Sequence, residues 1–325
     1  MFTTLFHSGE QEQSQDVDAK ALLVDNLKKT YRSDGKVLEA VRSVSLVLAA
    51  GEVLAFLGSN GAGKTTTIKM IAGLIRPDTG RVQVAGLNPH SNSQALQNLG
   101  AVLEGNRNLY WRLTPLENLE YFGILKGLTR RKARRRASEL LERFDLLSKR
   151  HTIVQNLSRG MQQKLAFAVA LVHQPRLLLL DEPTLGLDVE AIQNVKALVR
   201  SIAQEGCAIL LTTHQLDIAE ELSDRVAIIH KGKIIALETT RDLLQQFSGR
   251  AYSIEVEGEL DSARVKMLRG VGATVQAGRI VYLGNSEGLY QVLELLKPLP
   301  LIQVNKNSAD LTEIFLRLVR EKNNV

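Results

Sequence analysis

The sequence predicts an α/β fold with a largely parallel sheet, followed by a small α+β module. Two continuous apolar runs, LLLLDEP at 177–183 and AILLTTH at 208–214, end in polar residues, as buried parallel strands do. A long helical segment at 188–205 lies between them, and this alternation is typical of α/β proteins. A third apolar strand, EVLAFLG, leads directly into a glycine-rich loop and a helix. Functional side chains are therefore expected at the carboxyl ends of these strands.

Length and composition predict ordinary globular structure. The 325 residues suffice for one large domain and a small one, with 44% apolar and 23% charged residues. No apolar run reaches the roughly 18 residues that a membrane span needs. The polar segment 1–20 lacks the pattern of a signal peptide and is expected to be a flexible tail. The single cysteine, Cys207, excludes an internal disulfide framework and favours a reducing compartment.

The excess of positive charge is local. The net charge is +6, and the run RRKARRR at 130–136 holds six basic residues in seven. Without these six, the 41 basic residues fall to 35, which equals the number of acidic residues. Such a patch can meet phospholipid headgroups or nucleic acid, or can be a solvated helix face.

Local patterns divide the chain into further elements. The segment 21–46 predicts a strand pair with a turn at RSDGK. The helix after the glycine-rich loop, GKTTTIKMIAGLI, is expected to stop at the proline and glycine turn 76–80. Residues 114–150 are predicted to be helical, with Thr114 and Pro115 opening one helix and Thr129 capping the basic one.

The character of the sequence changes near Arg241. Segments from 241 to 325 follow the order β-α-β-β-α-β-α, which resembles a small ferredoxin-like module with a trailing helix. The module contains no cluster of residues that looks catalytic, so regulation, dimer contact and stabilisation remain open as roles. We therefore expect domains at 21–240 and 241–325.

The glycine-rich loop matches the phosphate-binding pattern G-x-x-x-x-G-K-[ST] of P-loop NTPases. Its glycines let consecutive backbone N–H groups face a phosphate at a helix N-terminus. The lysine supplies a point charge to the β- and γ-phosphates, and the threonine hydroxyl is a ligand for Mg²⁺. The loop and the next residue are Gly58, Ser59, Asn60, Gly61, Ala62, Gly63, Lys64, Thr65 and Thr66.

Two carboxylates follow the strand LLLLD. Asp181 ends the strand, where it can hold the metal from a second direction. Glu182 is next to it and can orient or deprotonate an attacking water. The pair alone is a weak pattern, but the phosphate loop earlier in the same chain makes a nucleotide hydrolase the favoured interpretation.

These motifs, with LSRGMQQ at 157–163, resemble the nucleotide-binding subunits of ABC transporters over about residues 21–240. LSRGMQQ is similar to the family signature LSGGQ, with Arg159 and Met161 in place of glycine and glutamine. The resemblance implies two subunits packed head to tail around two ATP molecules. Ser158 and the Gly160 N–H of one subunit would then contact the γ-phosphate held by the other.

The resemblance also assigns roles to single positions. Tyr31 matches the aromatic residue that stacks on adenine, and His214 matches the switch histidine at the γ-phosphate. Asp188 matches the loop that couples the two half-sites. Glu104 stands where the family has a metal-contacting glutamine, so weaker ATP binding or altered metal preference is expected. Trp111 falls in a segment that borders the groove for the membrane subunit, where an aromatic anchor is plausible; packing within its own domain is the alternative.

The resemblance therefore implies an ATPase of the exporter branch that uses ATP and Mg²⁺. Its helical subdomain would span about 105–165. It would act as a homodimer or with a paired subunit, on the cytoplasmic face of the membrane, with a separate multi-span permease and without nucleic acid. The transported substrate and the direction of transport do not follow from the residues.

The motifs leave two other classes of protein to compare with an ABC transporter subunit. A soluble ABC-type ATPase acting on the ribosome or nucleic acid is the main alternative, although such proteins usually carry two nucleotide domains or a long coiled coil. A GTPase switch is disfavoured because Asn305-Lys306-Asn307-Ser308 lacks the aspartate of the guanine motif.

Overall fold

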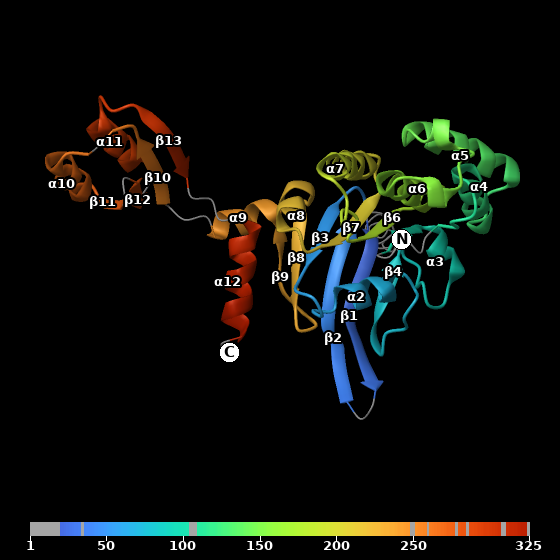
Figure 1. The fold of residues 1–325 in the computed structure, drawn as a ribbon. Helices are drawn as coiled ribbons and strands as arrows, with labels where there is room; N and C mark the ends of the chain where they lie inside the picture. The colour runs from blue at the N-terminus through green and yellow to red at the C-terminus, as the bar shows by residue number, and fades with distance from the viewer. Residues whose placement is uncertain are drawn as a thin grey trace, which may run out of the picture. The chain divides into compact units, whose positions relative to one another are not determined.

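The computed structural model describes residues 20–33, 36–103, 109–247, 251–258, 260–276, 279–283, 286–306 and 310–323. The chain divides into two compact units between Thr240 and Arg241 (Figure 1). Among the described residues, no helix is long and apolar enough to cross a membrane.

The first unit is built on a nine-stranded mixed sheet. Its central strands run parallel from β8 through β3, β7 and β6 to β5, while β1 pairs antiparallel with β2 and β4. The predicted strand pair and the three predicted apolar strands are all present. In sheet order the strands are β4 (Thr79–Val84), β1 (Lys20–Ser33), β2 (Lys36–Ala49), β9 (Lys233–Thr239), β8 (Arg225–His230), β3 (Val53–Leu57), β7 (Ala208–Thr213), β6 (Leu177–Asp181) and β5 (Leu99–Val102).

Helices cover this sheet, and several begin at a side chain that caps the helix. Thr114 and Thr129 accept hydrogen bonds from backbone N–H groups at the start of α4 and α5, as predicted. Ser158 and Asp188 do the same for α6 and α7. The helices are α2 (Lys64–Ile71), α3 (Ser93–Gln97), α4 (Pro115–Leu125), α5 (Arg130–Arg143), α6 (Arg159–Leu171), α7 (Val189–Gln204) and α8 (Leu216–Leu222), with short 3-10 turns at Leu147–Lys149 and Val154–Asn156.

Helix α2 is shorter than predicted. It ends at Ile71, with Ala72 as its C-cap, rather than continuing to the turn at 76–80. Gly73 adopts φ 75°, and Leu74 N–H returns to the Lys69 carbonyl at 2.9 Å. This left-handed glycine ends the helix before the proline is reached, because it turns the backbone away while its neighbours satisfy the last carbonyls.

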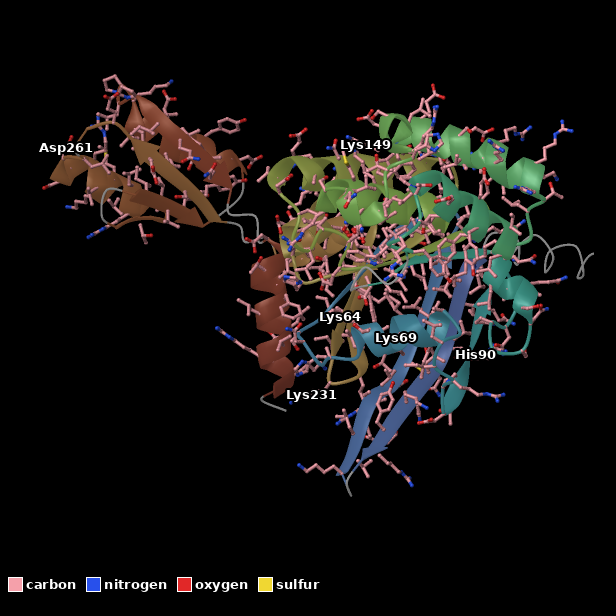
Figure 2. The ribbon with its side chains drawn as sticks, turned by 45° about the vertical axis from the view of Figure 1, so that its right-hand side comes forward. Lys64, Lys69, His90, Lys149, Lys231 and Asp261 are labelled. Atoms are coloured by element: carbon pink, nitrogen blue, oxygen red, sulfur yellow. The ribbon has the colours of Figure 1, made fainter. Side chains whose placement is uncertain are left out.

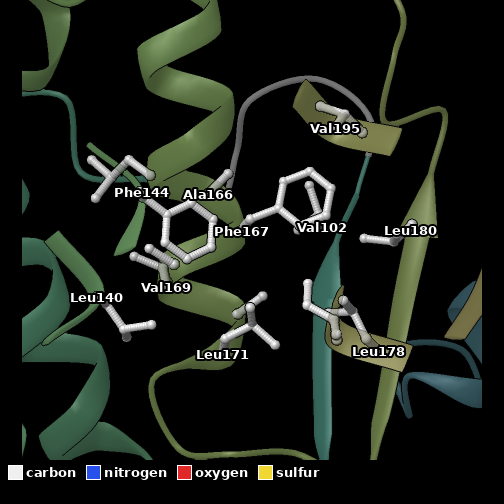
Figure 3. Packing of buried hydrophobic residues seen from close by; sticks show 14 of the residues in the cluster. Val102, Leu140, Phe144, Ala166, Phe167, Val169, Leu171, Leu178, Leu180 and Val195 are labelled. Carbon is white, nitrogen blue, oxygen red and sulfur yellow. The ribbon is translucent and has the colours of Figure 1, made fainter. Parts of the chain in front are cut away.

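Strand β6 contributes to two hydrophobic cores. Leu178 and Leu180 pack in the cluster around Phe167 on α6, which Figure 3 shows, whereas Leu177 and Leu179 pack in a second cluster on the other face of the sheet. All four leucines are fully buried. An uninterrupted apolar run was therefore needed, because successive side chains of a strand point to opposite faces and both faces are covered.

The second unit has the ferredoxin-like arrangement that the sequence predicted. Its four-stranded antiparallel sheet has the order β11-β12-β10-β13, and residues from 252 to 299 form its hydrophobic core. The elements are α9 (Thr240–Phe247), β10 (Ala251–Val256), α10 (Ser262–Gly270), β11 (Ala273–Gln276), β12 (Arg279–Leu283), α11 (Ser286–Leu296), β13 (Leu301–Lys306) and α12 (Leu311–Asn323).

Candidate functional site

The phosphate loop connects β3 to α2 and lies against two other strands. A Cβ atom on Gly58 would come within 2.6 Å of the Ile229 carbonyl oxygen at the end of β8. Gly63 adopts φ 110°, and a Cβ atom there would lie 2.5 Å from the Ala40 carbonyl oxygen on β2. Both positions therefore require glycine, which leaves the loop backbone free to curl around a small anion.

Lys64 begins α2, where Figure 2 marks it, and its side chain returns to the loop. Its Nζ donates to the Gly58 carbonyl at 2.6 Å and approaches the Ser59 carbonyl at 3.4 Å. The side chain is buried, while Thr65 and Thr66 beside it are half-buried. The Lys64 ammonium group and the hydroxyl groups of Thr65 and Thr66 therefore lie at the N-terminus of α2, where backbone N–H groups can bind an anion.

The structure brings Asp181, Glu182 and His214 together. Because β6 and β7 are neighbours, Asp181 lies opposite Thr212, whose hydroxyl donates a short hydrogen bond to the buried aspartate. Glu182 has φ 51°, and its N–H donates to the Thr212 carbonyl at 3.0 Å. His214 Nδ1 lies 2.9 Å from Glu182 Oε2 and donates to it. A carboxylate, an imidazole and a fixed aspartate therefore meet at one end of the sheet.

Two signature residues, Ser158 and Gly160, line a separate cavity of about 510 Å³ between α6 and α7. Ser158 caps α6 by accepting from the Met161 N–H at 3.2 Å, and Gly160 lines the same cavity. Asp181 and Glu182 line a different cavity, of about 500 Å³. Within one chain, Ser158 and Gly160 therefore line a different cavity from the acidic pair, although Arg159 of the same segment lines the cavity of the pair.

The cavity beside the acidic pair contains residues that the sequence analysis did not place there. Trp111 and Arg159 line it together with Glu182. Gln163 joins α6 to the segment after β6, because its Nε2 donates to the Pro183 carbonyl at 2.9 Å. Thr212 was also missed, although its position in the polar end TTH of β7 was a usable signal.

Two predicted positions, Tyr31 and Asp188, make other contacts in this structure. The ring of Tyr31 on β1 is partly exposed and lies 5.8 Å from Lys29 Nζ. Asp188 caps α7 by accepting from the Ala191 N–H at 2.8 Å. Glu104 lies outside the described residues.

The donor set fits Mg²⁺ held together with a nucleotide. Asp181 presents a buried carboxylate at the end of β6, and Thr65 presents a hydroxyl on the first turn of α2. Within the described ranges, no group of three or more His, Cys, Asp or Glu side chains could hold a metal by itself. This fits Mg²⁺ because Mg²⁺ usually takes one or two protein oxygens and completes its shell with phosphate oxygens and water.

Comparison with known proteins agrees with this geometry. The ABC transporter family matches residues 41–185. The chain is 37% identical over 215 residues to the ABC transporter ATP-binding protein NatA of Bacillus subtilis, covering 66% of this chain and 87% of that protein. It is 38% identical over 261 residues to the daunorubicin resistance ATP-binding protein DrrA3 of Streptomyces coeruleorubidus, covering 80% of this chain and 81% of that one.

Solved structures give the same result. A dimeric post-hydrolysis ATP-binding cassette with bound ADP and phosphate is 26% identical, with a TM-score of 0.61, covering 68% of this chain and 99% of that one. The chain therefore belongs to the ATP-binding proteins of the ABC transporter family.

Proposed function

We propose that this chain hydrolyses ATP to power an exporter whose permease is a separate protein. The contact between Glu182 and His214, beside Asp181, carries the proposal, because hydrolysis needs a base and a charge-stabilising group next to the bound phosphates. The daunorubicin resistance for which DrrA3 is named supports an exporter.

In the proposed reaction, Glu182 orients and deprotonates the attacking water. Its left-handed backbone and its hydrogen bond to His214 fix the direction of the carboxylate. Lys64, the first residue of α2 after the loop, and His214 stabilise the charge that develops on the transferred phosphoryl group. Thr65 and Asp181 would hold Mg²⁺, which when bound neutralises charge between the phosphate oxygens.

We further propose that two copies close head to tail around two ATP molecules. Ser158 and Gly160 line a cavity apart from their own acidic pair, so their anion-binding groups are available to a nucleotide held by another subunit. The dimeric cassette with bound ADP and phosphate supports such a pairing.

Coupling to the permease would use the cavity that Trp111 and Glu182 share. Trp111 is 46% exposed, so it can anchor a segment of the permease that enters the cavity. A segment bound at the Trp111 side of this cavity would meet Gln163, which is bonded to the backbone just after the acidic pair. Motion of the permease and the geometry of hydrolysis would therefore be linked.

The first test is Glu182→Gln, with Glu142→Gln on the exposed face of α5 as the matched control. We expect the first variant to bind ATP, to lose at least about a hundredfold in hydrolysis and to accumulate as an ATP-bound dimer in size-exclusion chromatography. The control should behave as the unmodified chain. Hydrolysis that persists in Glu182→Gln would remove this residue from the mechanism.

Mixing two inactive variants tests the head-to-tail arrangement. Lys64→Ala disables the phosphate loop, and Ser158→Arg disables the signature. A heterodimer of the two would hold one composite site with an intact loop and an intact signature, so mixing should restore part of the hydrolysis. If each site were complete within one chain, the mixture would remain inactive.

A further inference from the structure

The surface at the start of α5 combines unpaired positive charge with exposed apolar side chains. Arg130, Arg131 and Lys132 are exposed on the first turn of this helix. In the part of the chain that the structure describes, their side chains have no ion pair or hydrogen bond. The next three basic residues do have partners, namely Glu120 for Arg134 and Glu139 for Arg135 and Arg136.

This placement of charge works against the helix that carries it. A helix N-terminus bears partial positive charge, so cations in the first turn destabilise it, and α5 has no acidic residue there to compensate. The spacing adds repulsion, because Arg130 and Arg134, Arg131 and Arg135, and Lys132 and Arg136 are three like-charge pairs at i and i+4. An anionic partner would relieve both effects.

Apolar side chains lie at the same end of the helical hairpin. On α4, Tyr121, Ile124 and Leu125 occupy positions i, i+3 and i+4, so they share one face. They are 43%, 48% and 65% exposed. Singly exposed apolar residues are common, but three on one face beside a basic cluster form an amphipathic surface.

The two helices are held together at this end. A Cβ atom on Gly123 would come within 3.0 Å of the Ala133 Cβ atom, so α4 and α5 pack closely near the turn that joins them. The turn is tight, since Leu128 N–H donates to the Gly123 carbonyl at 3.0 Å. Figures 1 and 2 both show α4 and α5 side by side. We name Tyr121, Ile124, Leu125, Arg130, Arg131 and Lys132 the hairpin surface.

We propose that the hairpin surface docks on the headgroup region of an anionic lipid bilayer. The three free cations would meet lipid phosphates, and Leu125 with Ile124 would enter the boundary between headgroups and acyl chains. Charge complementarity favours this occupant, and the adjacent apolar face favours a lipid surface over nucleic acid, which offers phosphates but no apolar layer. The proposal goes beyond the proposed function, because it needs neither ATP nor the permease.

The test is co-flotation of the full chain, without nucleotide, with two kinds of vesicle. One is phosphatidylcholine alone, and the other contains about one third phosphatidylglycerol. We expect binding to the anionic vesicles only, weakened by raising the salt concentration. The triple variant Arg130→Gln, Arg131→Gln and Lys132→Gln should bind about a hundredfold more weakly, which is about fivefold for each charge removed.

Two further variants separate the contributions. Leu125→Ser should weaken vesicle binding about fivefold through the loss of apolar burial. The control Lys266→Gln with Arg269→Gln, which removes two exposed cations from α10, should bind as the unmodified chain does. The triple variant should unfold at the same or a higher temperature, since it removes cations from a helix N-terminus, so weakened binding would not reflect misfolding.

Several outcomes would overturn the proposal. These are equal binding to both kinds of vesicle, no binding to either, unchanged binding by the triple variant, and unchanged binding by Leu125→Ser. Binding to RNA or duplex DNA that depends on the same three cations, without binding to vesicles, would assign the surface to nucleic acid instead. Hydrolysis by the same preparations is measured separately, so failure of lipid binding would leave the proposed function intact.

Discussion

One backbone carbonyl shows how single residues hold the helical segment to the sheet. The Leu99 carbonyl on β5 accepts from Lys126 Nζ at 3.2 Å and from His173 Nε2 at 3.0 Å, and Lys126 also donates to the Leu96 carbonyl at 2.7 Å. Burial, aided by the Lys126 charge, lowers the pKa of His173 to about 4. Burial also lowers the pKa of Lys126. His173 is therefore neutral in the folded chain at pH 7.

This histidine makes stability depend on pH. Between its ordinary pKa of 6.5 and its folded pKa of about 4, the unfolded chain takes up a proton at this ring and the folded chain does not. The contribution of the neutral His173 ring to the free energy of unfolding is therefore fully present above pH 6.5 and is lost as the pH falls toward 4. We expect the difference in unfolding free energy between the unmodified chain and His173→Gln to shrink by about 1 to 3 kcal/mol over this range. Urea titrations at several pH values measure it, and parallel curves would contradict the assignment.

The nucleotide-site residues show what a sequence can reveal. Asp181 and His214 were placed correctly at strand ends because each follows an apolar run, which is a local pattern. The contact between Glu182 and His214 requires β6 and β7 to be neighbours, and strand order is set by long-range packing. The φ of 51° at Glu182 could not be predicted locally either, because glycine, asparagine and aspartate are the residues that commonly adopt a left-handed backbone.

At the scale of elements, helix boundaries were predictable where a side chain makes the boundary. Thr114 and Glu117 form a reciprocal capping box, in which the Thr114 N–H donates to Glu117 Oε2 at 2.8 Å and the Glu117 N–H donates back to the Thr114 hydroxyl. The early end of α2 at Ile71, just before Gly73, differs from the prediction, which took the proline farther on as the stronger stop. A glycine inside an apolar pattern can end a helix or simply be tolerated, and packing decides which.

Removing the cap of α4 should destabilise the chain. Thr114→Ala removes the hydroxyl that accepts from the Glu117 N–H and donates to Glu117 Oε2, so we expect a loss of about 1 kcal/mol in unfolding free energy, measured by urea titration. Thr129→Ala is the comparison, because Thr129 accepts from the Lys132 N–H at 3.4 Å, close to the 3.3 Å of the Thr114 cap, but has no reciprocal glutamate. The loss of unfolding free energy in Thr129→Ala should be smaller. Equal losses would show that the side-chain bond between Thr114 and Glu117 adds nothing.

At the scale of the whole molecule, the two units have separate cores. The first contains the complete nine-stranded sheet with both of its hydrophobic clusters, and the second is built on residues 252–299. Domains with their own cores generally fold on their own. The nucleotide site, from the phosphate loop to His214, lies entirely within the first unit.

A chain ending at Thr240 should therefore keep its ATPase function. We expect nucleotide affinity and hydrolysis within a factor of about two of the full chain, because no described residue of the site lies beyond the truncation. The same truncation carrying Glu182→Gln controls for contaminating hydrolases and should be inactive. Loss of nucleotide binding in a folded truncated chain would show that the second unit contributes directly to the site.

The cavity shared by Trp111 and Glu182 has a practical consequence. Trp111 is the only tryptophan of the chain, and the indole is partly in contact with solvent. Its emission spectrum therefore reports on the polarity of one place, without any attached dye. A peptide copied from a permease and seated in the cavity should shift that emission to shorter wavelength, so the natural sequence already contains an optical probe for docking.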